Sequence, residues 1–112
     1  MAASHFKLDN LVALVDCNGI QADGPIVLGI EPVVDKWIAF GWDAQQIDGN
    51  DMGQIVAAFE SARQLNGRPK AIIARTLPGK GVKSIEESEK AHFVNVPENA
   101  WQQAFAELEA SS

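Results

Sequence analysis

The chain is poor in cysteine and in basic residues. Its single cysteine, Cys17, excludes a disulfide within the chain, which is typical of a reducing compartment. Nine Lys and Arg against fifteen Asp and Glu give a net charge of −6, which argues against nucleic-acid or anionic-membrane surfaces. No apolar run approaches the roughly 20 residues of a membrane span, and Met1–Asp9 lacks the pattern of a signal peptide. We therefore expect a cytoplasmic protein without nucleic-acid or membrane partners.

The length and the apolar content set the size of the fold. A chain of 112 residues, 46% of them hydrophobic, suits one globular domain and not two. Apolar runs predict strands at 11–15 and 70–75, and residues 42–47 are predicted as a further strand with Asp43 and Gln45 on one face. Pro32 and Gly41 are the end signals of one helix, and an Asp51–Gln54 capping box and Asn66-Gly67 are those of a second. Together with helical periodicity they predict helices at 31–41 and 51–67, and a third begins at Pro97. This alternation predicts an α/β fold with a parallel sheet and flanking helices.

The predicted sheet has few strands for such a fold. The run from Leu11 to Val15 is continuously apolar, which predicts a strand buried on both faces with a neighbour on each side. Three strands leave two open edges, and open edges are usually covered or blunted. The pattern therefore favours a partial sheet, part of a larger fold.

The polar turn after the first strand is the first candidate site. In open α/β sheets, ligands sit outside the carboxyl ends of the strands, and Asp16, Asn18 and Ile20 stand there. The oxygen of an Asn side chain and a nearby carbonyl suit a hard cation such as Mg²⁺. However, Asn-Gly is also a common turn that needs no metal. Asp16 either helps to shape this site without binding the ion itself or is a turn-forming Asp that bonds its own backbone, and we expect the latter.

Several segments carry a family resemblance. The stretch K-L-D-N-L-V-A-L-V-D-C-N-G-I-Q-A-D-G resembles the second half of the thiamine-diphosphate motif of transketolases. The segments D-K-W-I-A-F-G-W, I-D-G-N-D and P-G-K-G-V match in the same order. The Gly-Asp-Gly that opens the family motif is absent from residues 1–10. The resemblance implies a single partial thiamine-diphosphate-binding domain over residues 1–112, a fragment of the N-terminal domain or subunit.

The resemblance also implies roles for individual residues. Asn18 and the backbone carbonyl of Ile20 would bind Mg²⁺ or Ca²⁺, which would hold the diphosphate of the cofactor, thiamine diphosphate. Gly79 and Gly81 belong to a loop beside the cofactor, where glycines either contact it or only shape the loop. His92 would approach the diphosphate and assist catalysis, the alternative being a surface or capping histidine.

The implied activity is the transfer of a two-carbon ketol unit between sugar phosphates, as in the pentose phosphate pathway. Alternatives are a deoxyxylulose-phosphate synthase or the first component of a 2-oxo-acid dehydrogenase. The implied partners are a second subunit in a dimer or a C-terminal transketolase half, and we expect the chain alone to be inactive. The second hypothesis is a non-catalytic remnant or interaction module that associates through its open sheet edge.

Overall fold

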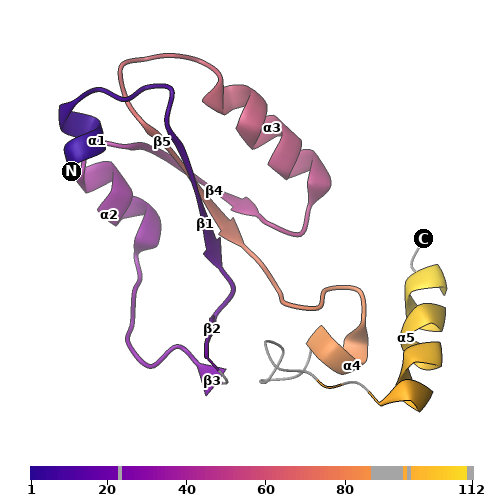
Figure 1. Cartoon of the computed structure of the whole chain (residues 1–112). Coiled ribbons are helices and arrows are strands. Elements are labelled where there is room, and N and C mark those ends of the chain that lie inside the picture. The colour runs from indigo at the N-terminus through magenta and orange to yellow at the C-terminus, as the bar shows by residue number, and fades with distance from the viewer. Residues whose placement is uncertain (23, 87–94, 96, 111–112) are drawn as a thin grey trace. The chain divides into compact units, whose positions relative to one another are not determined.

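The computed structural model describes residues 1–22, 24–86, 95 and 97–110 (Figure 1). They form two compact units, one of residues 1–18 and 29–76 and the other from the described parts of 19–28 and 77–112. We call these unit 1 and unit 2. In the described part of the chain, no helix is long and apolar enough to cross a membrane.

Unit 1 is built around a three-stranded parallel sheet with the strand order β1-β5-β4. The helices α2 and α3 cover opposite faces of this sheet (Figure 1). The predicted α/β fold with a parallel sheet and flanking helices is thus confirmed. In chain order the elements are α1 (Ala2–His5), β1 (Val12–Cys17), α2 (Val33–Ala39), β4 (Asp43–Asp48), α3 (Met52–Ala62) and β5 (Lys70–Arg75).

The central strand β5 carries the core. Ile72 and Ile73 are both 0% exposed and point to opposite faces of the sheet, as successive strand residues do. One core cluster packs under α3 and consists of Ile47, Ala58, Ala62, Ile72 and Ala74, with Ile55 against it. The other lies toward α2 and contains Val33, Trp42, Ala71 and Ile73. A run of isoleucine and alanine with no polar residue is what a strand covered on both faces requires.

The prediction that the first strand is buried on both faces is wrong. Strand β1 lies at the edge of the sheet, and its residues alternate between exposed and half-buried. Val12 and Leu14 are 37% and 57% exposed, since α3 packs on β4 and β5 and leaves this side of β1 bare. A hollow of about 370 Å³ lies between β1 and α3, with Val12 and Phe59 in its wall. We call the exposed side of β1 with Phe59 the bare face.

Local end signals explain where α2 and α3 begin and end. Gly41, with a φ of +85°, follows α2 as predicted. Asp51 caps α3 by accepting from the N–H of Gln54 at 3.0 Å, also as predicted. The Gln54 side chain does not complete the predicted capping box, because its Oε1 accepts from the N–H of Asp48. Helix α3 ends at Ala62, before the predicted Asn66-Gly67 stop.

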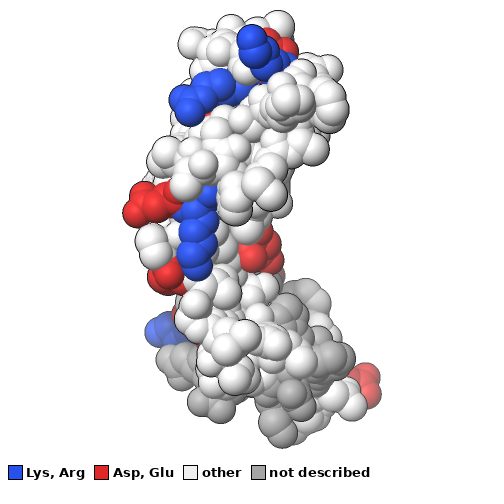
Figure 2. Space-filling view, turned by 90° about the vertical axis from the view of Figure 1, so that its left-hand side faces the viewer, with Lys and Arg blue, Asp and Glu red and all other residues white. Residues whose placement is uncertain are grey.

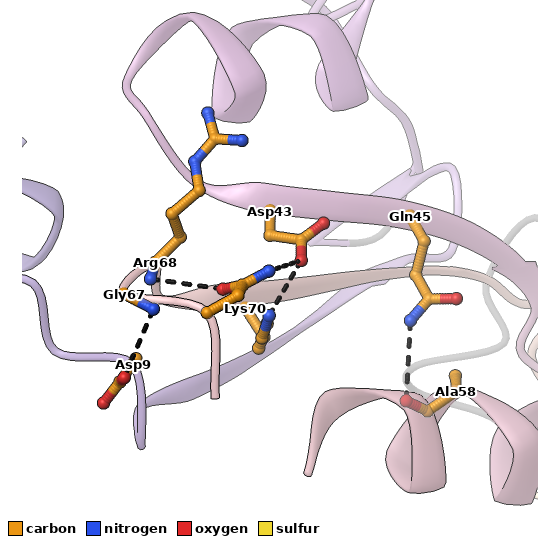
Figure 3. A network of polar contacts seen from close by, with 8 residues as sticks. Asp9, Asp43, Gln45, Ala58, Gly67, Arg68 and Lys70 are labelled. Carbon is orange, nitrogen blue, oxygen red and sulfur yellow. Dashed lines mark hydrogen bonds and ion pairs between the residues drawn. The ribbon is translucent and has the colours of Figure 1, made fainter. Parts of the chain in front are cut away.

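The amino ends of the strands are joined by a polar network (Figure 3). Lys70, only 5% exposed, donates to Asp43 Oδ2 at 2.8 Å, and Asn66 donates to the same oxygen at 2.8 Å. Gly67 N–H donates to Asp9 at 3.2 Å. Residues 66 and 67, beyond the end of α3 at Ala62, are therefore bonded to Asp43 of β4 and to Asp9 before β1.

Unit 2 contains short elements and one longer helix. They are β2 (Ile20–Gln21), β3 (Gly24–Pro25), α4 (Lys83–Glu86) and α5 (Glu98–Ala110). The antiparallel β2–β3 pair falls in a stretch expected to be a loop, since two-residue strands leave no periodicity to detect. The helix expected from Pro97 onward is confirmed as α5, on which Ala104 is buried.

Charges of both signs are interspersed on the surface. On the face drawn in Figure 2, the coloured side chains of Lys, Arg, Asp and Glu lie among a larger uncharged area. Two of the ion pairs in unit 1 join Lys70 to Asp43 and Arg75 to Glu31. Mixed charge of this kind produces no strong field of one sign on that face.

We predict that substitutions on the two adjacent strands differ in cost. Ile72→Ala should lower the free energy of unfolding by about 2–5 kcal/mol, because it leaves a cavity in a fully buried site. Leu14→Ala, at the paired position on β1, should cost about 1 kcal/mol or less, because Leu14 is mostly exposed. Urea denaturation measures both, and equal costs would contradict the exposure of the bare face.

A second prediction concerns acid. The hydrogen bond from Lys70, followed by that from Asn66, holds the pKa of Asp43 below its ordinary value. A carboxyl whose pKa is lowered by folding stabilises the fold above its unfolded pKa, and that stability is lost as pH falls through the folded value. We expect Asp43→Asn to flatten the decline of unfolding free energy below about pH 4. An unchanged decline in folded Asp43→Asn would contradict this contribution of the Asp43 carboxyl.

Candidate active site

The carboxyl ends of three strands meet at one edge of the sheet in unit 1. The register pairs Cys17 of β1 with Arg75 of β5, and Arg75 with Asp48 of β4. Asn18 and Thr76 follow two of these neighbouring strand ends. Ligands of parallel sheets bind at this edge, because the turns that leave it carry polar side chains and backbone groups.

Asp16 connects the ends of β1 and β5. One of its carboxylate oxygens accepts a hydrogen bond from the hydroxyl of Thr76. The other accepts from the side-chain amide of Asn18, with 3.3 Å between Nδ2 and Oδ2. The carboxylate therefore bonds two side chains at this edge. This differs from the expectation that Asp16 is a turn residue bonding its own backbone.

Gly49 sets the position of Thr76 from the other side. Its N–H donates to the carbonyl of Arg75 at 2.7 Å, which brings the turn after β4 against the end of β5. A Cβ added at Gly49 would lie 2.5 Å from Thr76 Cγ2 and 2.9 Å from Ala74 Cβ. Only glycine fits there without displacing these neighbours. The Thr76 methyl thus faces the β4 turn while its hydroxyl bonds Asp16.

Arg75 makes a separate set of contacts at the same edge. Its Nε donates to Gln46 Oε1 at 3.0 Å, and its guanidinium pairs with Glu31 at 2.5 Å. Glu31 also accepts from the N–H of Val33 at 3.0 Å, at the start of α2. The hydrogen bond from Arg75, followed by that from Val33, lowers the pKa of Glu31. Arg75 is thus bonded to a carboxylate of its own chain.

The glycine-rich loop has the backbone that its sequence predicts. Gly79 and Gly81 have φ values of +72° and +98°, which favour glycine. The loop amides are bonded within unit 2: Gly81 N–H donates to Glu86 Oε2 at 3.0 Å, and Val82 N–H donates to the carbonyl of Gly79 at 3.0 Å. A phosphate on Gly81 would replace the Glu86 carboxylate. The predicted contacts of Gly79 and Gly81 with the cofactor remain predictions.

The other predicted residues divide between the units. Asn18 closes the first segment of unit 1, whereas Ile20 is the first residue of β2 in unit 2, where it pairs with Pro25. His92 lies outside the described residues. The expected roles of Ile20 and His92 therefore remain predictions from the resemblance.

The donor set of this edge fits a hard cation with an anionic ligand. Among the described residues, no group of three or more His, Cys, Asp or Glu side chains could hold a metal ion. An ion at Asn18 would therefore be coordinated by amide and carbonyl oxygens of the protein and by the oxygens of a bound anion. Mg²⁺ commonly binds in this way, with few protein ligands together with substrate phosphates. The Asn18 amide nitrogen is bonded to Asp16, and the other polar atom of the same amide is an oxygen, the kind of donor that Mg²⁺ takes.

Sequence reasoning missed Gly49 and Thr76 as parts of this edge. One signal was present: the spacing Asp-x-Asn occurs at the carboxyl ends of two strands, at Asp16-Cys17-Asn18 and Asp48-Gly49-Asn50. Thr76 follows the strand between them. Its importance depends on the strand order β1-β5-β4, which the repeated spacing alone does not reveal.

Comparison with known proteins gives a consistent result. The family described as transketolase, thiamine diphosphate binding domain, matches residues 1–108. The transketolase family protein y4mO of Sinorhizobium fredii is 45% identical, over 98% of this chain and 40% of that protein. The 6-deoxy-6-sulfo-D-fructose transketolase subunit SqwG of a Clostridium species is 40% identical, over 97% of this chain and 40% of that protein. Human transketolase-like protein 2 is 40% identical, over 85% of this chain and 16% of that protein.

Solved structures agree on the fold. A transketolase of Pichia stipitis superposes on 97% of this chain with a TM-score of 0.66 and 22% sequence identity. This chain covers 20% of that structure. The chain therefore spans less than half the length of each of these relatives.

Proposed function

The chain belongs to the family of thiamine-diphosphate-binding domains of transketolases, and we propose that it is the diphosphate-holding part of a transketolase-like enzyme. The observation that carries the proposal is the place of Asn18 directly after β1, with its amide nitrogen bonded to Asp16. A family that binds a diphosphate needs such oxygen donors for the accompanying metal ion. The proposal treats residues 1–112 as one partial domain of a larger enzyme.

In this proposal the metal is Mg²⁺, with Ca²⁺ as the alternative, and it joins the protein to the diphosphate. Asn18 supplies its side-chain oxygen and Ile20 its backbone carbonyl. Thiamine diphosphate supplies the carbanion chemistry when bound, while the protein orients it. Gly79, Gly81 and His92 are proposed to border the cofactor, with His92 assisting catalysis.

The proposed reaction is the transfer of a two-carbon ketol unit between sugar phosphates. Two relatives are named for a sulfofructose transketolase and an apulose-4-phosphate transketolase, so the reaction class is shared while the named sugars differ. We propose sugar phosphates as the substrate class of this chain's enzyme. The single cysteine and the acidic composition support a cytoplasmic location for it.

The bare face supports a partner polypeptide. Val12 and Leu14 on β1 and Phe59 on α3 are exposed apolar residues beside an open strand edge. Open edges pair readily with further strands, and a parallel sheet is normally covered on both faces. We propose that the occupant is the remainder of a transketolase, on a second polypeptide. Two relatives are themselves named as transketolase subunits, which is consistent with a divided enzyme.

A non-catalytic role is the second candidate. The same bare face would let the chain associate with a complete transketolase subunit without contributing to turnover. Titration with the cofactor separates the two functions, since an interaction module needs no affinity for thiamine diphosphate.

We predict that the purified chain binds thiamine diphosphate and Mg²⁺ through Asn18. Asn18→Ala should weaken binding in calorimetric titration by at least about tenfold, because it removes an oxygen ligand or its close support. Asn50→Ala is the control, since Asn50 has the same Asp-x-Asn spacing at the end of β4. Wild-type chain that is folded by circular dichroism yet shows no saturable binding would favour the interaction module.

We further predict that the chain alone catalyses no ketol transfer. The bare face supports a further polypeptide in the active enzyme, and this chain covers only 40% of each of two relatives. The assay supplies a ketose phosphate donor, an aldose phosphate acceptor, thiamine diphosphate and Mg²⁺. Turnover by the chain without a second polypeptide would show that it is a complete catalyst and refute the partial-domain proposal.

A further inference from the structure

We propose that Asp16 is a positioning residue that orients the Asn18 amide. Asp16 is itself held by the Thr76 hydroxyl, and Gly49, which has no side chain, leaves room for the Thr76 methyl. This inference rests on the proposed function, in which the Asn18 oxygen faces the metal ion. Its physical basis is a series of contacts that runs across the carboxyl edge of the sheet, from the turn after β4 to the turn after β1.

The first step concerns the amide itself. The nitrogen and oxygen of an Asn side chain share one carbon, so a bond that holds the nitrogen also sets the direction of the oxygen. Asn18 Nδ2 lies 3.3 Å from Asp16 Oδ2. A carboxylate only accepts hydrogen bonds, and it therefore selects the amide orientation in which the nitrogen faces it. Groups behind a metal ligand commonly orient it in this way.

The second step concerns what holds Asp16. Its other oxygen accepts from the Thr76 hydroxyl. Thr76 follows β5, whose residues 70–74 are buried, and its methyl packs at the position where Gly49 has no side chain. Asp16 is thus braced by the rigid centre of the sheet, although it lies on an exposed edge strand.

A comparison within the molecule shows that the sequence spacing does not by itself create this arrangement. Asp48, the last residue of β4, and Asn50 have the same Asp-x-Asn spacing. There, Asp48 Oδ1 accepts from the backbone N–H of Asn50 at 2.9 Å, which is an ordinary turn bond. Asp16 instead bonds the side chains of Asn18 and Thr76. The two turns therefore supply a test residue and a matched control.

Nuclear magnetic resonance tests the inference without any ligand. The side-chain amide signals of Asn18 are followed in the ¹⁵N-labelled chain and in Asp16→Ala, Thr76→Val, Thr76→Ser and Asp48→Ala. We expect Asp16→Ala and Thr76→Val to shift these signals and to speed their hydrogen exchange. Thr76→Ser keeps the hydroxyl and should retain the wild-type signals, as should Asp48→Ala. Backbone spectra establish that each variant is folded. Unchanged Asn18 signals in folded Asp16→Ala and Thr76→Val would overturn the inference.

Calorimetric titration with Mg²⁺ and thiamine diphosphate then tests the link to binding. Asp16→Ala and Thr76→Val should weaken binding by about 10–100-fold, the usual effect of removing support from a metal ligand. Thr76→Ser should restore most of the affinity, and Asp48→Ala should match the wild type. Altered Asn18 signals without loss of affinity would overturn the positioning role. A wild-type chain that does not bind refutes the proposed function, while the Asn18 signals still decide whether Asp16 orients the amide.

Discussion

The burial of β5 between two parallel neighbours is the constraint on which unit 1 depends. Its backbone hydrogen bonds are shared with β1 on one side and β4 on the other. Its side chains alternate between the core under α3 and the core toward α2. Because β5 is held in this way, the residues at its two ends become fixed points. Lys70 anchors the polar network at the amino ends, while Arg75 and Thr76 anchor the turns at the carboxyl ends.

Much of this architecture could be predicted from local patterns. The strand at 70–75, the helix after Pro32 and the Asp51 cap each carry their signal within a few consecutive residues. The exposure of β1 could not be predicted in the same way. An apolar run shows that burial is favourable, but it does not show which residues provide the cover. The pair β2–β3 is too short for periodicity, and Asn66, expected at the end of α3, instead lies beyond the helix and bonds Asp43, which is distant in sequence.

In the candidate site, too, the residues with a local sequence signal could be predicted and those placed by the strand order could not. Asn18 could be found from its place after a strand and from the family motif. Thr76 and Gly49 could not, because their roles depend on which strands are neighbours. For the glycine-rich loop, the left-handed conformations of Gly79 and Gly81 followed from residue type. The bond from Gly81 to Glu86 depends on the course of the chain beyond the loop.

The position of Asn18 directly after an edge strand has a thermodynamic consequence. A polypeptide that pairs with β1 would change the stiffness of the strand whose end carries the Asp16 and Asn18 contacts. Assembly and ligand binding would then be linked equilibria. By reciprocity, any factor by which the partner raises affinity for the diphosphate is the factor by which the diphosphate raises affinity for the partner. The cofactor would in that case stabilise the association of the polypeptides as well as take part in the reaction.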